Sequence, residues 1–239
     1  MTPAPALHDD DGWAPQLLRT RIYEALVVDI VMGALRPGDL VLERALAARR
    51  GWGLAGVRDA LARLALEGLV VRHPRVGTVV APLDRAEVEQ AFEVRRLLDA
   101  RSAGLAARHA TAEDVAALAA AFEGAEAAVA RRDGRALVEM DRAFHRAVAR
   151  ATHNAMLARW LGQLWTAAAR WWVFAMGEQD PAEQLADIRL HRDLAAAIAA
   201  GDAAEAEAAM ARLIGDPPSL TPPLLRPVPA ALGAAREPV

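Results

Sequence analysis

The sequence of 239 residues contains no cysteine, which excludes disulfide bonds, thiolate metal sites and cysteine nucleophiles. It also lacks any uninterrupted apolar run close to the roughly eighteen residues that a membrane-spanning helix needs. Its opening segment, MTPAPALHDDDGW, has neither the basic nor the apolar region of a secretory signal peptide. From these absences we expect a soluble, cytoplasmic protein that does not contact the membrane.

Lysine is absent as well, so all 28 basic residues are arginines. Their distribution is uneven along the chain. Residues 13–82 hold 10 Arg and 6 acidic residues, a balance of +4, whereas residues 83–239 hold 18 Arg and 22 acidic residues, a balance of −4. This asymmetry suits a module that binds a polyanion, joined to a second module that does not.

The N-terminal part has the pattern of a winged helix-turn-helix between residues 13 and 82. Apolar residues at helical spacing, with Gly or Pro at the breaks, predict helices over 15–32, 43–51 and 54–67. Two short β-rich segments at 69–72 and 78–80 flank a turn at 73–77, as in the wing of such a domain. This module places one helix in the major groove of DNA.

From residue 84 onward the sequence has almost no strand signal, so we expect an all-α bundle of about six helices over 84–214. Thr111, Asn154 and Asp202 are candidate N-caps. The expected helices lie near residues 84–109, 111–132, 134–152, 154–176, 181–200 and 202–214. We expect disorder in residues 1–12 and a mobile, Pro-rich tail over 215–239.

Two strings, ALVVDIVMGALRPGDLVLERALA and VRDALARLALEGLVVRHPRVGTVVAP, resemble the GntR family of bacterial transcription regulators. A helical bundle behind such a head is typical of its FadR-type branch, whose C-terminal part is the effector-binding FCD domain. The resemblance covers about residues 15–214. It implies a mainly α protein: an N-terminal winged helix-turn-helix followed by a six-helix effector-binding bundle.

The resemblance assigns operator contacts to Arg44 and Arg58. The helical pattern agrees for Arg58, because burial of Val57 and Leu61 turns Arg58 outward, where a guanidinium can bind guanine O6 and N7. In the wing, the basic side chains that can follow the DNA backbone or minor groove are Arg72, His73 and Arg75. The alternative is that these side chains are solvated surface charges.

The start of the expected recognition helix departs from the family pattern. Gly53 and Leu54 stand where the family usually has a hydroxyl residue and an arginine, and Gly56 stands where it usually has Pro or Thr. This change removes an N-cap side chain and a base-reading cation. It predicts weaker DNA binding or a different operator, and it leaves open an effector-binding protein whose head no longer binds DNA.

A second set of residues, Asp141, His145 and His191, has the chemistry of a divalent metal site. Asp141 and His145 are four residues apart and share a helix face. The set suits zinc, nickel, manganese or iron, and the resemblance implies a fourth ligand at a position that Leu213 occupies. The open alternative is that the three line an effector pocket without a metal.

Arg95 is the candidate partner for an anionic effector, together with Asp141, His145 and His191; its alternative role is an ion pair with Asp99. Several aromatic residues are expected in the core and pocket wall: Trp160, Trp165, Trp171, Trp172 and Phe174.

The whole pattern predicts a homodimeric repressor that binds an imperfect palindrome and is released by a small carboxylate. A metal-dependent hydrolase is the rival class, but the sequence has no H-E-x-x-H pair or nucleophile elbow. We therefore do not expect an enzyme.

Overall fold

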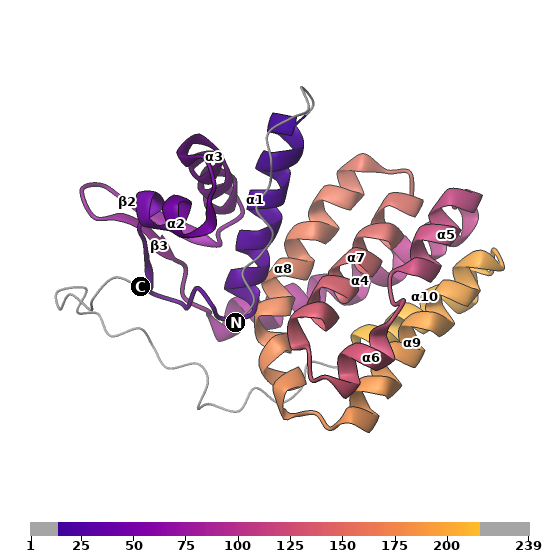
Figure 1. Cartoon of the computed structure of the whole chain (residues 1–239). Helices are drawn as coiled ribbons and strands as arrows, with labels where there is room; N and C mark the ends of the chain where they lie inside the picture. Colours follow the sequence, from indigo (N-terminus) through magenta and orange to yellow (C-terminus); the bar gives the residue numbers. More distant parts are fainter. Residues whose placement is uncertain (1–13, 216–239) are drawn as a thin grey trace. The chain divides into compact units, whose positions relative to one another are not determined.

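The computed structural model describes the chain from Ala14 to Gly215, except for the side chains of residues 14–18, 85, 172 and 174–178. Within this range the contacts divide the chain after Pro82 into two compact units (Figure 1). The segment expected to be disordered at 1–12, and all of the expected tail except Gly215, lie outside the described residues. No helix among the described residues is long and apolar enough to cross a membrane.

The first unit combines three helices with a small sheet, as the winged helix-turn-helix pattern predicted. In chain order its elements are α1 (Ala14–Val31), β1 (Leu40–Val41), α2 (Glu43–Arg50), α3 (Leu54–Leu66), β2 (Val70–His73) and β3 (Gly77–Val80). Helix α3 packs against both α1 and α2. The core between them is apolar and follows helical spacing, with Val57, Leu61 and Leu64 fully buried on α3.

The sheet of the first unit has the strand order β1-β3-β2, and both pairs are antiparallel. Strand β2 begins and ends one residue later than the expected strand at 69–72, and β3 begins one residue before the expected strand at 78–80. Strand β1 was not predicted, because it is two residues long and pairs only through β3. At the wing turn, Arg75 has φ 67° and Gly77 has φ 123°. The left-handed backbone at Gly77 is a conformation that glycine adopts easily.

The second unit is all-α within the described residues. Its helices are α4 (Arg85–His109), α5 (Ala112–Ala120), α6 (Ala125–Ala130), α7 (Gly134–Ala151), α8 (Ala155–Glu178), α9 (Pro181–Ala199) and α10 (Ala203–Ile214). The single helix expected over 111–132 is therefore wrong, since two helices replace it. The break ends at Gly124, whose φ of 78° is incompatible with a continuing right-handed helix.

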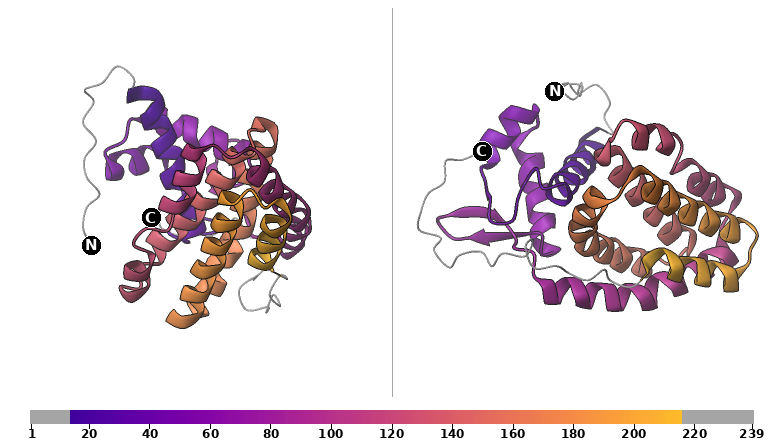
Figure 2. Two further views of the ribbon diagram at one scale, coloured as in Figure 1. Left: turned by 90° about the vertical axis from the view of Figure 1, so that its right-hand side faces the viewer. Right: turned by 90° about the horizontal axis from the view of Figure 1, so that it is seen from below.

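Helix α4 contacts α7, α8, α9 and α10, and α7 contacts α5, α6 and α8, so these two helices connect most of the bundle. In the right-hand view of Figure 2, the long magenta helix α4 runs along one edge of the bundle. The expected N-caps are confirmed: the side chains of Thr111, Asn154 and Asp202 accept backbone N–H groups of α5, α8 and α10. The bundle interior is not purely apolar. Among its described side chains, six charged or ionisable ones are buried: Arg95, Asp99, Asp141, Arg142, Arg170 and His191.

Candidate nucleic-acid interface and metal centre

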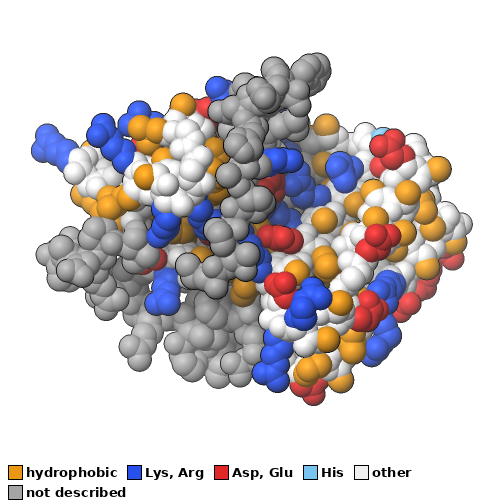
Figure 3. Space-filling view, in the orientation of Figure 1, with side chains coloured by type: hydrophobic (Ala, Val, Ile, Leu, Met, Phe, Trp, Pro, Cys, Tyr) orange, Lys and Arg blue, Asp and Glu red, His pale blue; other side chains and the backbone are white. Residues whose placement is uncertain are grey.

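Arg58 lies on the exposed face of α3, between two residues, Val57 and Leu61, that are buried against the rest of the first unit. Its Nε donates a hydrogen bond to Oε2 of Glu43 at 2.8 Å. On the face drawn in Figure 3, arginine side chains project from the first unit with few acidic side chains beside them. The helix therefore presents its cation to solvent, which a base-reading side chain requires.

The other four basic residues predicted to contact DNA also lie in the first unit. Arg44 is exposed on α2, next to Glu43. Arg72 in β2 is exposed, and its Nη2 donates to the backbone oxygen of Arg58 at 3.2 Å. His73 is half-buried at the end of β2, and Arg75 is exposed in the wing turn. The structure thus links the wing directly to α3 through Arg72, a contact that the sequence did not predict.

The glycines at the start of α3 have separate structural roles. Gly53 is the N-cap residue, and no side chain caps the helix there. A Cβ added at Gly56 would lie 2.7 Å from Cδ1 of Ile22 on α1, inside any normal contact distance. Gly56 therefore allows α3 to pack closely on α1, which gives a packing reason for this departure from the family pattern.

In the second unit, the three predicted metal ligands come together. Oδ1 of Asp141 on α7 lies 3.6 Å from Nε2 of His145 on the same helix and 3.2 Å from Nε2 of His191 on α9. One donor atom from each residue lies within 4.8 Å of the other two. Asp141 and His191 are buried, and the His145 side chain is 12% exposed. The i,i+4 spacing on α7 accounts for the first pair, and helix packing brings in His191.

Two further residues orient this cluster. Nε1 of Trp165 on α8 donates a hydrogen bond to Oδ2 of Asp141 at 2.6 Å, leaving Oδ1 facing the histidines. Nδ1 of His191 lies 2.9 Å from the backbone oxygen of Asp187, so this nitrogen carries the proton and donates. Sequence reasoning missed both contacts. A signal for Asp187 existed, because Asp187 and His191 repeat the D-x-x-x-H spacing of Asp141 and His145.

Burial and charge shift the pKa values of the cluster in different directions. Burial alone raises the pKa of Asp141, but the two histidines and the Trp165 hydrogen bond outweigh it and lower the value to about 2. Burial and the nearby Arg95 charge lower the pKa of His145 to about 3, against the pull of Asp141. Burial raises the pKa of Asp187 to about 6. Asp141 is thus a carboxylate and His145 a neutral imidazole at neutral pH.

These donors fit a divalent metal. Zinc and similar ions take imidazole nitrogen and carboxylate oxygen, and ligating histidines usually donate their second ring N–H to a carbonyl or carboxylate. His191 makes that contact with Asp187, and Trp165 orients the carboxylate of Asp141. Leu213, at the position where the resemblance implies a fourth ligand, has an apolar side chain that cannot ligate. A metal held by the three residues would keep coordination positions open.

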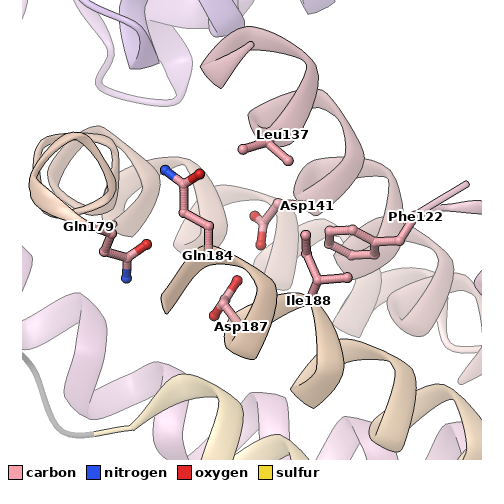
Figure 4. A pocket seen from close by; sticks show the side chains of 7 residues that line it. All are labelled: Phe122, Leu137, Asp141, Gln179, Gln184, Asp187 and Ile188. Atoms are coloured by element: carbon pink, nitrogen blue, oxygen red, sulfur yellow. The ribbon is translucent and has the colours of Figure 1, made fainter. Parts of the chain in front are cut away.

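A small pocket that is open to solvent lies beside Asp141 (Figure 4). One side of it is apolar, and the other carries oxygen atoms from acidic and amide side chains. Its lining residues are Phe122, Leu137, Asp141, Gln179, Gln184, Asp187 and Ile188. Oε1 of Gln179 is buried without a hydrogen-bond partner among the described residues. A buried acceptor of this kind is normally satisfied by a ligand or water.

Arg95 makes the ion pair that the sequence left open as its alternative role. Its Nε donates to Oδ2 of Asp99 at 2.8 Å, and both side chains are buried in the bundle. Its contact with an effector stays a prediction. Of the aromatic residues, Trp165 and Trp171 are buried, whereas Trp160 is 54% exposed and is not a core residue. The side chains of Trp172 and Phe174 lie outside the described residues.

Comparison with known proteins gives a consistent assignment for both units. Residues 18–80 match the gntR family of bacterial regulatory proteins, and residues 90–216 match the FCD domain. A probable D-xylose utilization operon transcriptional repressor of Paenarthrobacter nicotinovorans is 31% identical over 207 residues, covering 84% of this chain and 88% of that protein. The transcriptional regulator LutR of Bacillus subtilis is 31% identical over 201 residues, covering 74% of this chain and 89% of LutR.

A solved structure, that of McbR from Escherichia coli, shares the fold. Its TM-score is 0.71 at 23% sequence identity, and the match covers 82% of this chain and 93% of McbR. The winged helix-turn-helix and the helical bundle are therefore a known combination. The chain belongs to the GntR family of bacterial regulatory proteins, and it is a DNA-binding, ligand-responsive transcriptional regulator with a C-terminal FCD domain.

Proposed function

We propose that this regulator is a cytoplasmic homodimer that represses transcription from an imperfect palindrome and is released by a small organic acid. The observation that carries the DNA-binding part is the exposed guanidinium of Arg58 opposite the buried face of α3. Two copies of α3, about one helical turn of DNA apart, would read the two half-sites. Repression as the direction of control is supported by the Paenarthrobacter relative, which is named a repressor.

On DNA, the five basic residues have different tasks. Arg58 reads guanine in the major groove, because its guanidinium can donate two parallel hydrogen bonds to O6 and N7. Arg44, at the start of α2, binds a phosphate or a base edge. The wing residues Arg72, His73 and Arg75 follow the backbone or the minor groove and set the register without reading sequence.

In the bundle, Asp141, His145 and His191 would hold a divalent metal (zinc, nickel or manganese), which would supply a Lewis-acidic position for a ligand carboxylate. The protein orients its own ligands through Trp165 and Asp187. The effector occupies the adjoining pocket, where the unpartnered oxygen of Gln179 would accept a hydrogen bond from it. Effector binding moves the regulator off DNA only because one arrangement of the dimer binds the effector better than another.

The missing N-cap side chain at Gly53 favours one rival function, that of an effector-binding protein that does not bind DNA.

Fluorescence anisotropy distinguishes this rival from a DNA-binding regulator. It compares binding to the DNA fragment upstream of the gene with binding to a scrambled fragment of equal length. We expect specific binding by the native protein and a loss of roughly 1–3 kcal/mol in Arg58→Ala. Arg192→Ala, an exposed arginine in the bundle, is the matched control and should bind normally. Equal binding to both fragments by native protein would refute DNA recognition.

The same preparation tests the metal. Protein purified without chelator should contain a divalent ion, and addition of that ion to stripped protein should raise the melting temperature. Asp141→Asn should lose both effects, because it removes a charged ligand while nearly preserving side-chain volume. If the protein contains no divalent ion and its melting temperature does not rise when one is added, the three residues do not bind a metal and only line the pocket.

A further inference from the structure

The contact between Glu43 and Arg58 joins helices α2 and α3 of the winged helix-turn-helix unit, which is called the head below. Glu43 is the first residue of α2, and its Oε2 accepts a hydrogen bond from Nε of Arg58 at 2.8 Å. The Glu43 side chain is 28% exposed and that of Arg58 is 56% exposed. Ion pairs as exposed as this contribute little to stability, so a structural role does not explain the contact by itself.

The geometry of the guanidinium explains what the contact can do. Its five N–H donors lie in one plane, with Nε on one edge and the two Nη groups at the far end. A carboxylate held by Nε leaves the end that carries both Nη groups directed away from Glu43. This end is the one that donates in parallel to O6 and N7 of guanine.

Arg58 is held from a second side as well. Arg72 in the wing donates from Nη2 to the backbone oxygen of Arg58 at 3.2 Å, so β2 is tied to α3 at this residue. Backbone and side chain of the same residue are thereby positioned by different elements. A base-reading arginine held this way loses less conformational freedom on binding than a free one.

Glu43 is distinguished from the other acidic residues of the head by its partner. Asp59 on α3 pairs with Arg19, and Glu67 at the end of α3 pairs with Arg63 and accepts from Tyr23. The ion pair of Glu43, in contrast, engages the predicted base-reading side chain.

We propose that Glu43 is a positioning residue for DNA recognition: it orients Arg58 so that guanine is preferred at one position of each half-site. This inference rests on the proposed role of Arg58 in DNA binding. Glu43 also places a negative charge near phosphates, which lowers affinity for DNA of any sequence. Glu43 thus lowers the affinity for DNA of any sequence and increases the discrimination between bases.

This role predicts that loss of Glu43 changes two measured quantities in opposite directions: affinity for DNA of any sequence rises, and discrimination between bases falls. In Glu43→Ala, affinity for scrambled DNA at low salt should rise about twofold to threefold, because a repulsive charge is lost. Discrimination between guanine and adenine, at the base pair that Arg58→Ala identifies, should fall about tenfold. Loss of folding would lower both quantities, so this pattern is not a stability effect.

The test measures both quantities by anisotropy titration for the native protein, E43A, E43Q, R58A and E43A/R58A. Glutamine keeps the acceptor oxygen but loses the charge, so E43Q should retain most of the discrimination and still bind scrambled DNA more tightly. In the R58A background, E43A should not change discrimination further. Hydrogen exchange in α2 and α3 reports whether each variant is folded. If E43A is unfolded, the comparison of E43Q with the native protein is used instead.

Three results would overturn the proposal. If R58A loses discrimination but E43A and E43Q do not, Glu43 does not position Arg58, and the proposed function stands. If E43A binds the operator more tightly with unchanged discrimination, Glu43 competes with DNA. If R58A itself has no effect on specific binding, the role of Arg58 fails and the inference fails with it.

Discussion

The two units of this regulator place their charged residues in opposite ways. In the winged-helix unit, helix faces built from Val57, Leu61 and Leu64 make an apolar core, and the arginines predicted to bind DNA are on or near the surface. In the bundle, Arg95, Asp141 and His191 are buried. On the face drawn in Figure 3, the surface of the bundle carries side chains of both signs.

The difference follows from the size of what each unit binds. A DNA duplex is recognised on its outside, so the protein's cations must reach it from an exposed surface. A small molecule or metal ion is enclosed, and in a site with little water each hydrogen bond and charge acts more strongly. Burying such groups is costly unless they are paired, and here Asp141 is paired with two histidines and Trp165.

The largest expected effect tests whether the two units are separate in stability. Leu61 in α3 and Leu194 in α9 are both fully buried. Truncation of either to alanine should lower the free energy of unfolding of its own unit by about 2–5 kcal/mol, through lost burial and a cavity. Hydrogen exchange followed by mass spectrometry can report on each unit separately.

Each leucine variant serves as the control for the other. Leu61→Ala should speed exchange in α3 and leave α7 unchanged, and Leu194→Ala should do the reverse. Faster exchange in both units from a single substitution would show that they unfold together, and the two units would then differ in charge placement but not in stability.

A smaller effect tests whether the buried polar contacts serve the metal. Trp165→Phe keeps an aromatic ring but removes the N–H that orients Asp141. We expect metal affinity, measured by competition with a chelating dye, to fall about 10- to 100-fold, the usual cost of losing an outer contact to a ligand.

The matched control is Trp171→Phe, since Trp171 is buried in an apolar cluster with Val88, Phe92 and Ala168. It should keep the native metal affinity. Equal losses in the two variants would mean that the effect comes from packing of the bundle and not from the hydrogen bond to Asp141.

The smallest effect concerns the close packing of α3 on α1. Alanine favours helix more than glycine by roughly 0.5–1 kcal/mol, but overpacking costs about 1–3 kcal/mol. A Cβ at Gly56 meets Cδ1 of the buried Ile22. Gly56→Ala should therefore destabilise the first unit by about 1 kcal/mol in chemical denaturation.

Ile22→Val removes the atom that is in the way, so the double variant should be more stable than the sum of the two single effects predicts. Gly53→Ala is the control, because a Cβ there meets nothing within 4 Å and φ is −68°. If Gly56→Ala stabilised the unit, the helix preference of alanine would outweigh the contact with Ile22.

Much of the fold was predictable because it depends on neighbours in sequence. Helical spacing located α1, α3 and α7, and the turn residues located the wing. The same spacing placed Asp141 and His145 on one helix face, and the family pattern added His191. The expected helix over 111–132 failed because alanine-rich sequence continues through the break, and Gly124 alone did not signal it.

The sequence by itself determined most of the helices and their apolar faces, the basic character of the first unit and the D-x-x-x-H pair, because these follow from residues a few positions apart. Only the tertiary structure decided that Glu43 holds Arg58, that Trp165 orients Asp141, and that Gly56 accommodates Ile22. These partners lie 15, 24 and, by their numbering, 34 residues apart. At such separations, helix packing and not local periodicity sets which side chains meet.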